Sequence, residues 1–419
     1  MLNQTLFLFI ALMLLWATSS LRFTPPPSRI TAIRSIALSA FPDTQKHKYL
    51  GGSQLQKSGD IYAVPSHSSN VLKISPTSST STLLAPSPAF PTLKFKWLRA
   101  VNVHDKFVIG LPCWADSVLK IDTTSDTVTT FGESFFSSLP HKPSSLRWNW
   151  HGGQLSSKNG FVYAVPANAP RVLKVHPHDE TCSLVGPELP GSTKYYGGIL
   201  DNDDNIYCVP YKNTRVLKIS PEENGGETVS EIGGEYTSLS DENTENYSWH
   251  GGVHCSDNDC VYAFPSHATS VLKIDCSSDE THLIGELRNS EYKWLGGTVD
   301  RLNNIWGVPS DATTILKIFT GTDKVVEVES EVIDKKKNKF QGAVAVGDYV
   351  YGIPSNEGFI LRVNILTDEV TKIEGLRLPH IKDKFQGAFE REGKIWFVPE
   401  CYPCPINVDL ETLEITEVV

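Results

Sequence analysis

The sequence lacks an excess of positive charge. It holds 38 Lys and Arg residues against 48 Asp and Glu residues, which gives a formal net charge of −10. A protein that binds nucleic acid through the phosphate backbone needs a clustered basic surface, so this balance argues against a nucleic-acid partner. The one basic run, residues 334–339 (DKKKNK), is interpreted as a solvated loop.

Long apolar runs are also missing. The run from Leu6 to Trp16 is too short to cross a bilayer, which takes about 20 residues. It has the length of a signal-peptide core, and small residues follow it at positions 17–20. We therefore interpret residues 1–20 as a signal peptide and predict no transmembrane span in the mature chain. An uncleaved membrane anchor is the alternative.

Catalytic signatures are scarce as well. The sequence has no G-x-S-x-G motif and no phosphate-binding loop, and no nucleophile can be paired with an adjacent base. We therefore name no catalytic residue and predict no cofactor.

What the chain has instead is a repeat. Residues 249–275 (WHGGVHCSDNDCVYAFPSHATSVLKID) show its order: an aromatic residue, one variable residue, Gly-Gly, an apolar run ending in proline, and Val-Leu-Lys-Ile. The strand-ending proline recurs at steps of 44 to 55 residues, at Pro65, Pro112, Pro166, Pro210, Pro265, Pro309, Pro354 and Pro399. A fixed period of this length indicates a repeat architecture.

Each repeat contains four short β-type runs and almost no helical periodicity. Units of about 45 residues with four strands are typical of propeller blades. We predict an all-β fold over residues 48–419, an eight-bladed β-propeller with four antiparallel strands per blade, present as a monomer. Seven blades plus an irregular eighth unit is the alternative. The aromatic residues are expected to wedge between blades.

The repeat resembles two known groups of propellers. The order x-Gly-Gly-x-Leu, then Gly-x-Ile-Tyr-x-x-Pro, then Val-Leu-Lys-Ile-Asp is similar to the NHL and YVTN repeats. The resemblance covers residues 48–419 and implies a propeller. The wider class includes scaffolds, lactonases and lyases, so it does not choose a function.

The segment between the apolar core and the repeats has a composition of its own. Residues 21–40 contain three Arg, many Ser and Thr, a Pro-Pro-Pro run and no acidic residue, as transit peptides do. With Phe41 behind Ser39-Ala40, this resembles the bipartite presequence of algae with secondary plastids. We interpret residues 21–47 as a presequence or a disordered N-terminal segment. A strand at residues 29–36 that pairs with the last blade is the alternative.

One variable position points to a binding face. It lies between the aromatic residue and the glycines, where the first strand begins beside the mouth of the central channel. Around the ring it reads Leu50, Leu98, His151, Tyr196, His250, Leu295, Gln341 and Gln386. The polar members suit recognition of a polar ligand. His67 and His267 follow the strand-ending proline on the same rim, so the predicted ligand-binding residues are His151, Tyr196, His250, Gln341, Gln386, His67 and His267. Alternatively, each of these side chains packs only against its own loop.

Four histidines on one face also raise the question of a metal. His151 and His250 are two blades apart, and no Asp or Glu recurs beside them at ligand spacing. We therefore predict no metal site. The basic residue of the Val-Leu-Lys-Ile motif is expected to cover apolar surface with its stem while its charge stays in water, at Lys73, Lys120, Lys174, Lys218, Lys273, Lys317 and Arg362.

Two long connections and eight cysteines are the remaining features of the sequence. The loops 131–147 and 233–247 lead into the two blades that carry Trp-His-Gly-Gly, and the second loop holds a glycosylation sequon at Asn246. Behind a signal peptide, disulfides are expected, with Cys255–Cys260 and Cys401–Cys404 as the candidate pairs.

The function predicted from these features is binding rather than catalysis. We expect a non-enzymatic binding or scaffold propeller that recognises a protein, peptide or glycan at the channel mouth. The expected location is the secretory pathway or the extracellular space, with a plastid or a membrane-anchored location as alternatives. A lactonase-like or lyase-like enzyme with its pocket at the channel mouth is the alternative function.

Overall fold

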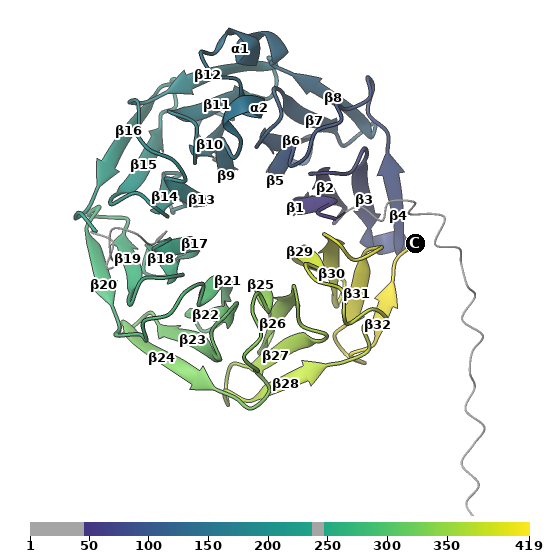
Figure 1. Ribbon diagram of the computed structural model, residues 1–419, viewed down its shortest axis with the longest axis vertical. Coiled ribbons are helices and arrows are strands. Elements are labelled where there is room, and N and C mark those ends of the chain that lie inside the picture. Colours follow the sequence, from purple (N-terminus) through teal and green to yellow (C-terminus); the bar gives the residue numbers. More distant parts are fainter. Residues whose placement is uncertain (1–45, 237–246) are drawn as a thin grey trace, which may run out of the picture. The chain divides into compact units, whose positions relative to one another are not determined.

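The computed structural model confirms the eight-bladed propeller (Figure 1). The chain divides into two units, residues 1–39 and 40–419, and the structure describes residues 46–236 and 247–419, all in the second unit. Eight sheets of four antiparallel strands follow one another in chain order, and each sheet uses four consecutive strands. The first strand of each blade lies innermost, around the centre of the ring (Figure 1).

The strands of the first four blades have the following bounds. Blade one holds β1 (Tyr49–Gln54), β2 (Ile61–Pro65), β3 (Val71–Ser75) and β4 (Thr80–Leu84). Blade two holds β5 (Trp97–Val103), β6 (Phe107–Pro112), β7 (Val118–Asp122) and β8 (Thr127–Phe131). Blade three holds β9 (Trp150–Leu155), β10 (Val162–Pro166), β11 (Val172–His176) and β12 (Thr181–Val185). Blade four holds β13 (Tyr195–Leu200), β14 (Ile206–Pro210), β15 (Val216–Pro221) and β16 (Glu227–Ile232).

The other four blades continue the same order. Blade five holds β17 (Trp249–Cys255), β18 (Cys260–Pro265), β19 (Val271–Asp275) and β20 (Thr281–Ile284). Blade six holds β21 (Trp294–Val299), β22 (Asn304–Pro309), β23 (Thr314–Phe319) and β24 (Lys324–Glu329). Blade seven holds β25 (Phe340–Val346), β26 (Tyr349–Pro354), β27 (Ile360–Asn364) and β28 (Val370–Ile373). Blade eight holds β29 (Phe385–Arg391), β30 (Lys394–Pro399), β31 (Ile406–Asp409) and β32 (Ile415–Glu417).

Three short helices interrupt the β-structure of residues 46–236 and 247–419. The 3-10 turn η2 (Pro76–Ser78) joins β3 to β4, while α1 (Glu133–Ser138) and α2 (Pro143–Leu146) lie in the long connection into blade three. Phe136 of α1 is buried against Trp150, so this loop is packed onto the ring. Of the second long connection, residues 237–246 lie outside the described residues, and with them the predicted sequon at Asn246. No helix among the described residues is long and apolar enough to cross a membrane.

A β-bulge recurs at the inner end of every blade. In blade one, Tyr49 lies opposite Pro65 and Gly52 lies opposite Ala63, so Leu50 and Gly51 together face one residue of β2. The same irregularity occurs in all eight blades. A bulge bends its strand and re-aims the side chains beside it. The variable position is therefore one of the two bulged residues, at the point where the strand enters the channel.

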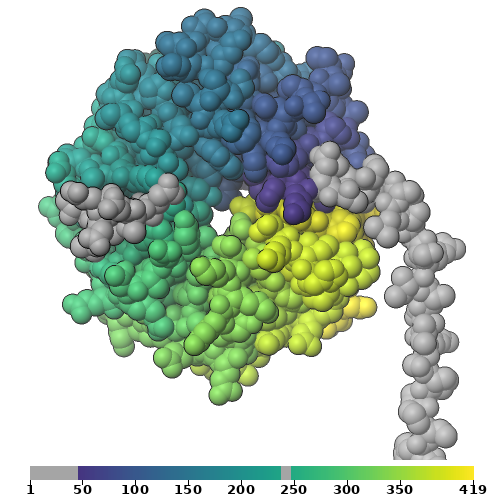
Figure 2. Space-filling model, viewed as in Figure 1, coloured from purple at the N-terminus to yellow at the C-terminus, as the bar shows by residue number. Residues whose placement is uncertain are grey.

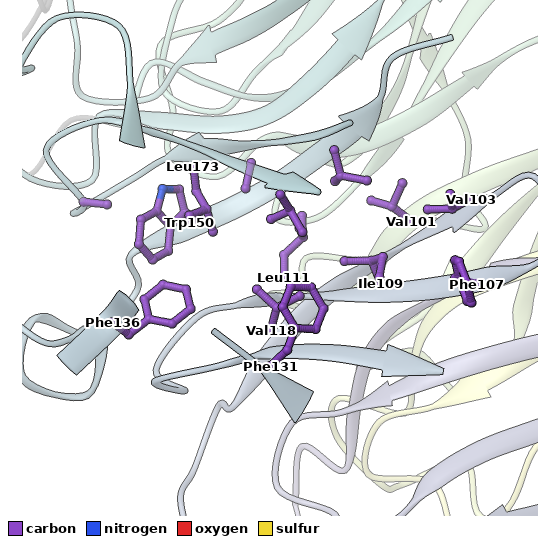
Figure 3. Close-up of a cluster of buried hydrophobic side chains, with 14 residues drawn as sticks. Val101, Val103, Phe107, Ile109, Leu111, Val118, Phe131, Phe136, Trp150 and Leu173 are labelled. Atoms are coloured by element: carbon purple, nitrogen blue, oxygen red, sulfur yellow. The ribbon is translucent and has the colours of Figure 1, made fainter. Parts of the chain in front are cut away.

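The predicted aromatic wedges form the core between blades. All eight are buried: Tyr49, Trp97, Trp150, Tyr195, Trp249, Trp294, Phe340 and Phe385. Eight clusters of the core each lie between two neighbouring blades, and a ninth, smaller cluster contains Leu50, Leu98 and Cys113. Figure 3 shows the cluster between blades two and three, where Trp150 lies beside Leu173 and Phe136. Tryptophan also anchors its own blade, since Trp97 Nε1 donates to the Ser117 carbonyl at 2.8 Å.

The prediction that the third-strand lysines keep their charge in water is wrong. Six of them pair with a carboxylate of the next blade: Lys73–Asp126, Lys120–Glu180, Lys174–Glu227, Lys218–Asp279, Lys273–Asp323 and Lys317–Asp368. In blade seven, Arg362 instead stacks on the Tyr349 ring, with its Cζ atom 3.6 Å from the ring centroid. The prediction failed because a single repeat does not reveal that the turn before the next blade's fourth strand reaches this side chain.

A second set of lysines was not predicted at all. The residue before the aromatic wedge is a buried lysine in six blades: Lys48, Lys96, Lys194, Lys293, Lys339 and Lys384. Lys96 Nζ donates to the Ser66 carbonyl of the preceding blade at 2.9 Å, and Lys293 Nζ donates to that of Ser266 at 3.1 Å. Burial lowers the pKa of Lys194, Lys293 and Lys384 to about 8. Five of these side chains bond a carbonyl of the preceding blade, whereas Lys339 Nζ donates to the Lys336 carbonyl of its own loop.

The ring closes between blade eight and blade one through such contacts. The Lys48 backbone N–H donates to the Glu400 carbonyl at 3.0 Å, and Lys48 Nζ donates to that of Tyr402 at 2.6 Å. Blade eight takes all four of its strands from residues 385–417. The alternative strand at residues 29–36 lies outside the described residues.

The predicted disulfides are not formed in this structure, where all eight cysteines are free thiols. Cys255 and Cys260 are paired across β17 and β18, but their sulfur atoms lie near different partners. Cys255 Sγ lies 3.9 Å from Thr320 Oγ1, and Cys260 Sγ lies 3.2 Å from the Asn258 carbonyl. Cys404 is buried in the core between blades seven and eight, whereas Cys401 is half-buried beside the backbone of His47.

Candidate functional site

A channel runs through the centre of the propeller. It has a volume of about 690 Å³ and is lined by the first strands and their bulges. Figure 2 shows the hollow at the centre of one face of the ring. Four of the predicted residues line it, namely His151, Tyr196, His250 and Gln341.

Three of these side chains form one stack, which we call the ring trio. The Tyr196 ring lies between those of His151 and His250, with centroid distances of 3.5 Å and 3.6 Å. His250 Nδ1 is 2.8 Å from the Leu295 carbonyl, whereas His151 Nδ1 is buried and has no hydrogen-bond partner within the described parts of the chain. The bulges of three consecutive blades therefore bring together side chains that lie 45 and 54 residues apart in the sequence.

The ring trio is electrically neutral near pH 7. Burial lowers the pKa of His250 to about 4 and that of His151 well below its usual value, because a buried imidazole loses the hydration that stabilises its charge. The positive charge of Arg99 lowers both pKa values further. Burial also raises the pKa of Tyr196 to about 12, so its hydroxyl keeps its proton.

Arg99 is a channel residue that the sequence reasoning missed. It stands in blade two at the first glycine position of the repeat and lines the channel beside Gly51. The signal was visible in the sequence, since Trp97-Leu98-Arg99-Ala100 replaces aromatic-x-Gly-Gly. The absence of glycine from this one blade is the feature that distinguishes it in the sequence.

The ring trio is the centre of a longer row of rings, which we call the aromatic arc. Its members contact one another in sequence with centroid distances of 3.5 to 6.5 Å. They are His47, His67, Phe95, Trp114, Trp148, His151, Tyr196, His250, Tyr211, Tyr247, His267 and Tyr292. Most of these rings are half-buried. The arc follows the rim from blade one to blade six.

The other predicted residues fall at separate places. His67 and His267 belong to the two ends of the arc, with His67 4.4 Å from Phe95 and His267 4.5 Å from Tyr292. Gln341 Nε2 donates to Ser355 Oγ at 3.2 Å, and Gln386 is buried. Leu50 of blade one packs with Leu98 and Cys113 of blade two, so it contacts the neighbouring blade and not only its own loop.

The rim of blades seven and eight is polar where the arc is aromatic. The position two residues before the wedge holds His47, Phe95, Trp148, Tyr247 and Tyr292 in five blades and Thr193 in blade four, but Asn338 and Asp383 in blades seven and eight. The buried Glu400 lies nearby, with Oε1 2.5 Å from His47 Nδ1, and this contact raises the pKa of His47. The rim thus has one aromatic side and one hydrogen-bonding side.

Within the described part of the chain, two groups of side chains have the composition of a metal site. They are His47, Asp383 and Cys401 at the closure of the ring, and His254, Asp259 and Cys276 between β17 and β19, each with candidate ligand atoms within 4.8 Å of one another. In the second group, His254 Nε2 is already 2.8 Å from Asp259 Oδ1. The histidines considered in the sequence, His67, His151, His250 and His267, are not in either group.

Comparisons with known proteins support the fold alone. No known protein family matches the sequence, and no curated protein matches it. Among solved structures, virginiamycin B lyase from Staphylococcus aureus is 15% identical with a TM-score of 0.55, covering 74% of this chain and 92% of that one. Apo AztD from Citrobacter koseri is 13% identical with a TM-score of 0.51, covering 77% and 84%. The computationally designed Ika8 protein is 11% identical with a TM-score of 0.56, covering 85% and 95%. An enzyme and a designed protein share this architecture, so the fold does not decide the function.

Proposed function

We propose that this protein is a non-enzymatic binding propeller that recognises a peptide segment of a partner protein on its channel-mouth face. The observation that carries the proposal is the aromatic arc. Twelve rings in continuous contact form a row far longer than one sugar ring would cover. Tyr and Trp are enriched at protein interfaces, where they supply contact area at a small cost in conformational entropy.

Unsatisfied polar atoms along the arc support the same proposal. Trp114 Nε1, His67 Nε2, His151 Nδ1 and His267 Nε2 are buried and have no hydrogen-bond partner among the described residues. Buried polar atoms without a partner are uncommon in native proteins and call for an explanation. A bound peptide offers backbone carbonyl and amide groups, which these atoms can bond.

Four cations beside the arc favour an acidic peptide, while the carboxylates of Glu400 and Glu291 lie at its two ends, near His47 and His267. Arg147 lies over the Trp114 ring with its Cζ atom 4.7 Å from the centroid, and Lys212 Nζ lies 4.9 Å from the centroid of Tyr247. Lys46 and Lys94 line a cavity beside His67 and Phe95. These cations stand next to the rings, so an acidic peptide gains electrostatic attraction as well as contact area.

The test uses the repeat itself as the control. Trp148 and Tyr247 occupy the same repeat position as Asn338 and Asp383, so the double variants W148A/Y247A and N338A/D383A change equivalent sites on opposite sides of the rim. Peptides selected on the full-length chain from a displayed library should bind W148A/Y247A at least tenfold more weakly, about 1.4 kcal/mol. Binding to N338A/D383A should be unchanged. Equal affinity for both variants, or selection of glycans instead of peptides on an array, would count against the proposal.

The location of the protein forms part of the same proposal. Residues 1–20 act as a signal peptide that directs the chain into the secretory pathway, where an extracellular or lumenal partner would meet the arc. N-terminal sequencing of the protein purified from its own cells tests this, since a mature chain that begins at Met1 would contradict it.

An enzymatic alternative has one specific observation in its favour. His151 is neutral near pH 7, lines the channel and has a buried Nδ1 without a hydrogen-bond partner among the described residues, so the channel wall contains an uncharged imidazole that can accept a proton. A lactone or ester substrate small enough for the channel could use it. Hydrolysis of a lactone panel that is abolished in His151→Asn would establish this alternative, and absence of turnover across the panel would leave the binding function.

A further inference from the structure

The bulge of blade two contains an arginine where the repeat places glycine. The equivalent residues are Gly51, Gly152, Gly197, Gly251, Gly296, Gly342 and Gly387. Six of these have positive φ, between +66° and +118°. Arg99 also has positive φ, at +65°, so it takes up a conformation that an L side chain rarely adopts. Strained residues of this kind cluster at functional sites, which makes Arg99 a candidate.

The stem of Arg99 is held by the neighbouring blade. A Cβ atom added at Gly51 would come within 3.3 Å of Arg99 Cδ and 3.6 Å of Arg99 Cα. The arginine therefore crosses the bulge of blade one, which has room for it because residue 51 is a glycine. This contact fixes the direction of the side chain, and Arg99 is exposed toward the channel.

The guanidinium group has no counterion in this position. Arg99 is the only residue with a formal charge among the channel-lining residues that the structure describes, and Asp and Glu are absent from that lining. No hydrogen bond or ion pair of its side chain occurs within the described ranges. The ring trio is close enough to sense its charge, yet it remains neutral. The channel thus contains one uncompensated positive charge.

From this arrangement we infer that the channel is a binding site for a single carboxylate, with Arg99 as the residue that binds it. The fork of a guanidinium matches the two oxygens of a carboxylate, and charge-assisted bonds of this type are strong where little water competes. His151 Nδ1 and the Tyr196 hydroxyl provide neutral hydrogen-bonding groups in the same channel. One cation suits a monoanion better than a phosphate with two charges.

The carboxylate can come from two sources. It can belong to a free small organic acid, for which about 690 Å³ is ample space, or it can be the C-terminus of a peptide that lies on the aromatic arc. The second source rests on the proposed function, whereas the first does not. The chemistry at Arg99 is the same in both cases.

The experiment uses Arg99→Gly, which restores the residue that the repeat carries in the other seven blades. Binding of sodium benzoate and of benzamide, its neutral isostere, is measured by titration calorimetry on the full-length chain. We expect wild type to bind benzoate at least tenfold more tightly than benzamide, and R99G to lose that difference. Arg99→Lys, which keeps the charge without the fork, should retain part of it. The melting temperature of R99G should be equal to or above that of wild type, which separates lost binding from lost folding.

A second arm separates the two sources. Peptides that bind the arc are compared with free and with amidated C-termini, on wild type and on R99G. A tenfold loss on amidation that disappears in R99G identifies a chain end as the ligand, whereas benzoate binding without it identifies a free acid. If neither benzoate nor the free C-terminus depends on Arg99, the inference is wrong, and peptide binding that still needs Trp148 and Tyr247 would leave the proposed function intact. If R99G weakens carboxylate binding while W148A/Y247A leaves peptide binding unchanged, the proposed function is wrong and the carboxylate site is supported.

Discussion

The third strands of this propeller repeat one side chain at the same position, whereas the inner bulges vary theirs from blade to blade. In the third strands, six blades place a lysine at the same position and pair it with a carboxylate of the next blade, as Lys73 does with Asp126 at 2.8 Å. In the bulges, the same backbone geometry recurs in all eight blades while the side chains differ. The variable position holds Leu, His, Tyr or Gln, and the first glycine position once holds Arg.

This difference separates the residues that join neighbouring blades from the residues that line the channel. Six of the eight blades make the same ion pair with the next blade, so the lysine repeats at one position. A side chain that points into a shared channel has no blade-specific partner to satisfy, and it can differ from blade to blade. We call the third-strand lysines and their carboxylate partners the lysine layer, and the two bulged residues of each first strand the bulge layer. Substitutions in the lysine layer should therefore change the stability of the fold. Substitutions in the bulge layer should change ligand binding and the dependence of stability on pH.

The largest stability loss is expected at the most deeply buried pair of the lysine layer. Lys174 is 6% exposed, and its Nζ contacts Glu227 Oε2 at 2.5 Å. Lys174→Met leaves the Glu227 carboxylate without its cation, with the Tyr163 hydroxyl still donating to it at 3.2 Å, and breaking a buried pair in this way costs about 3 kcal/mol. Denaturant unfolding should show the loss, and benzoate affinity should not change. A parallel loss of benzoate binding would mean that the two layers are coupled.

The next effect belongs to the bulge layer and depends on pH. Burial holds the pKa of His250 at about 4 in the folded chain, below the ordinary value of 6.5. Between these values the unfolded chain takes up a proton that the folded chain does not, so stability falls as the pH drops from 6.5 toward 4. His250→Gln, which copies the residue of blades seven and eight, should remove about 2 kcal/mol of the loss between pH 6.5 and 4.5.

The pH dependence is measured by thermal unfolding of both proteins across that range. Gln341→His is the reciprocal control, because it places an imidazole at the same repeat position in blade seven. It should make the fold more sensitive to acid. An H250Q variant with the wild-type pH dependence would show that the ring trio accepts protons in the folded state.

The fold could be predicted from the sequence because its determinants are local and repeated. Each unit carries its own strand-ending proline and aromatic wedge, and both recur at a regular period. The strand ends at Pro65 and the burial of Trp97 follow from that pattern alone. The number of blades follows by counting.

The site could be predicted only in part, because it depends on contacts between repeats. The variable position identified His151, Tyr196 and His250, but their stacking depends on the angle between neighbouring blades. The buried lysines were missed because Lys293 looks like a surface residue until its carbonyl partner in the preceding blade is known. The disulfides were inferred from compartment and spacing, which do not show that Cys401 faces His47 while Cys404 enters the core.

A smaller change in stability is expected from the positive φ of Arg99. Gly251 has φ of +66°, close to the +65° of Arg99, and a Cβ added there would meet no atom within 4 Å. Gly251→Ala therefore isolates the conformational cost, which is about 1 kcal/mol for an L residue in the left-handed region. Arg99→Gly should stabilise the chain by a similar amount. If R99G destabilises it, the arginine is there for structure rather than for binding.

The smallest effect is expected where a pair of the lysine layer reaches the surface. Lys120 Nζ is 2.7 Å from Glu180 Oε1, but the Glu180 side chain is 49% exposed, so water competes for both charges. Glu180→Gln should cost about 0.5 kcal/mol, and less at high salt, because exposed ion pairs contribute little. Lys120 also keeps its position over the Phe107 ring at 4.1 Å. Denaturant unfolding of E180Q beside K174M compares the two pairs directly. Equal losses would show that the repeat stabilises every blade interface alike, while the expected sixfold difference would show that burial sets the contribution of each pair.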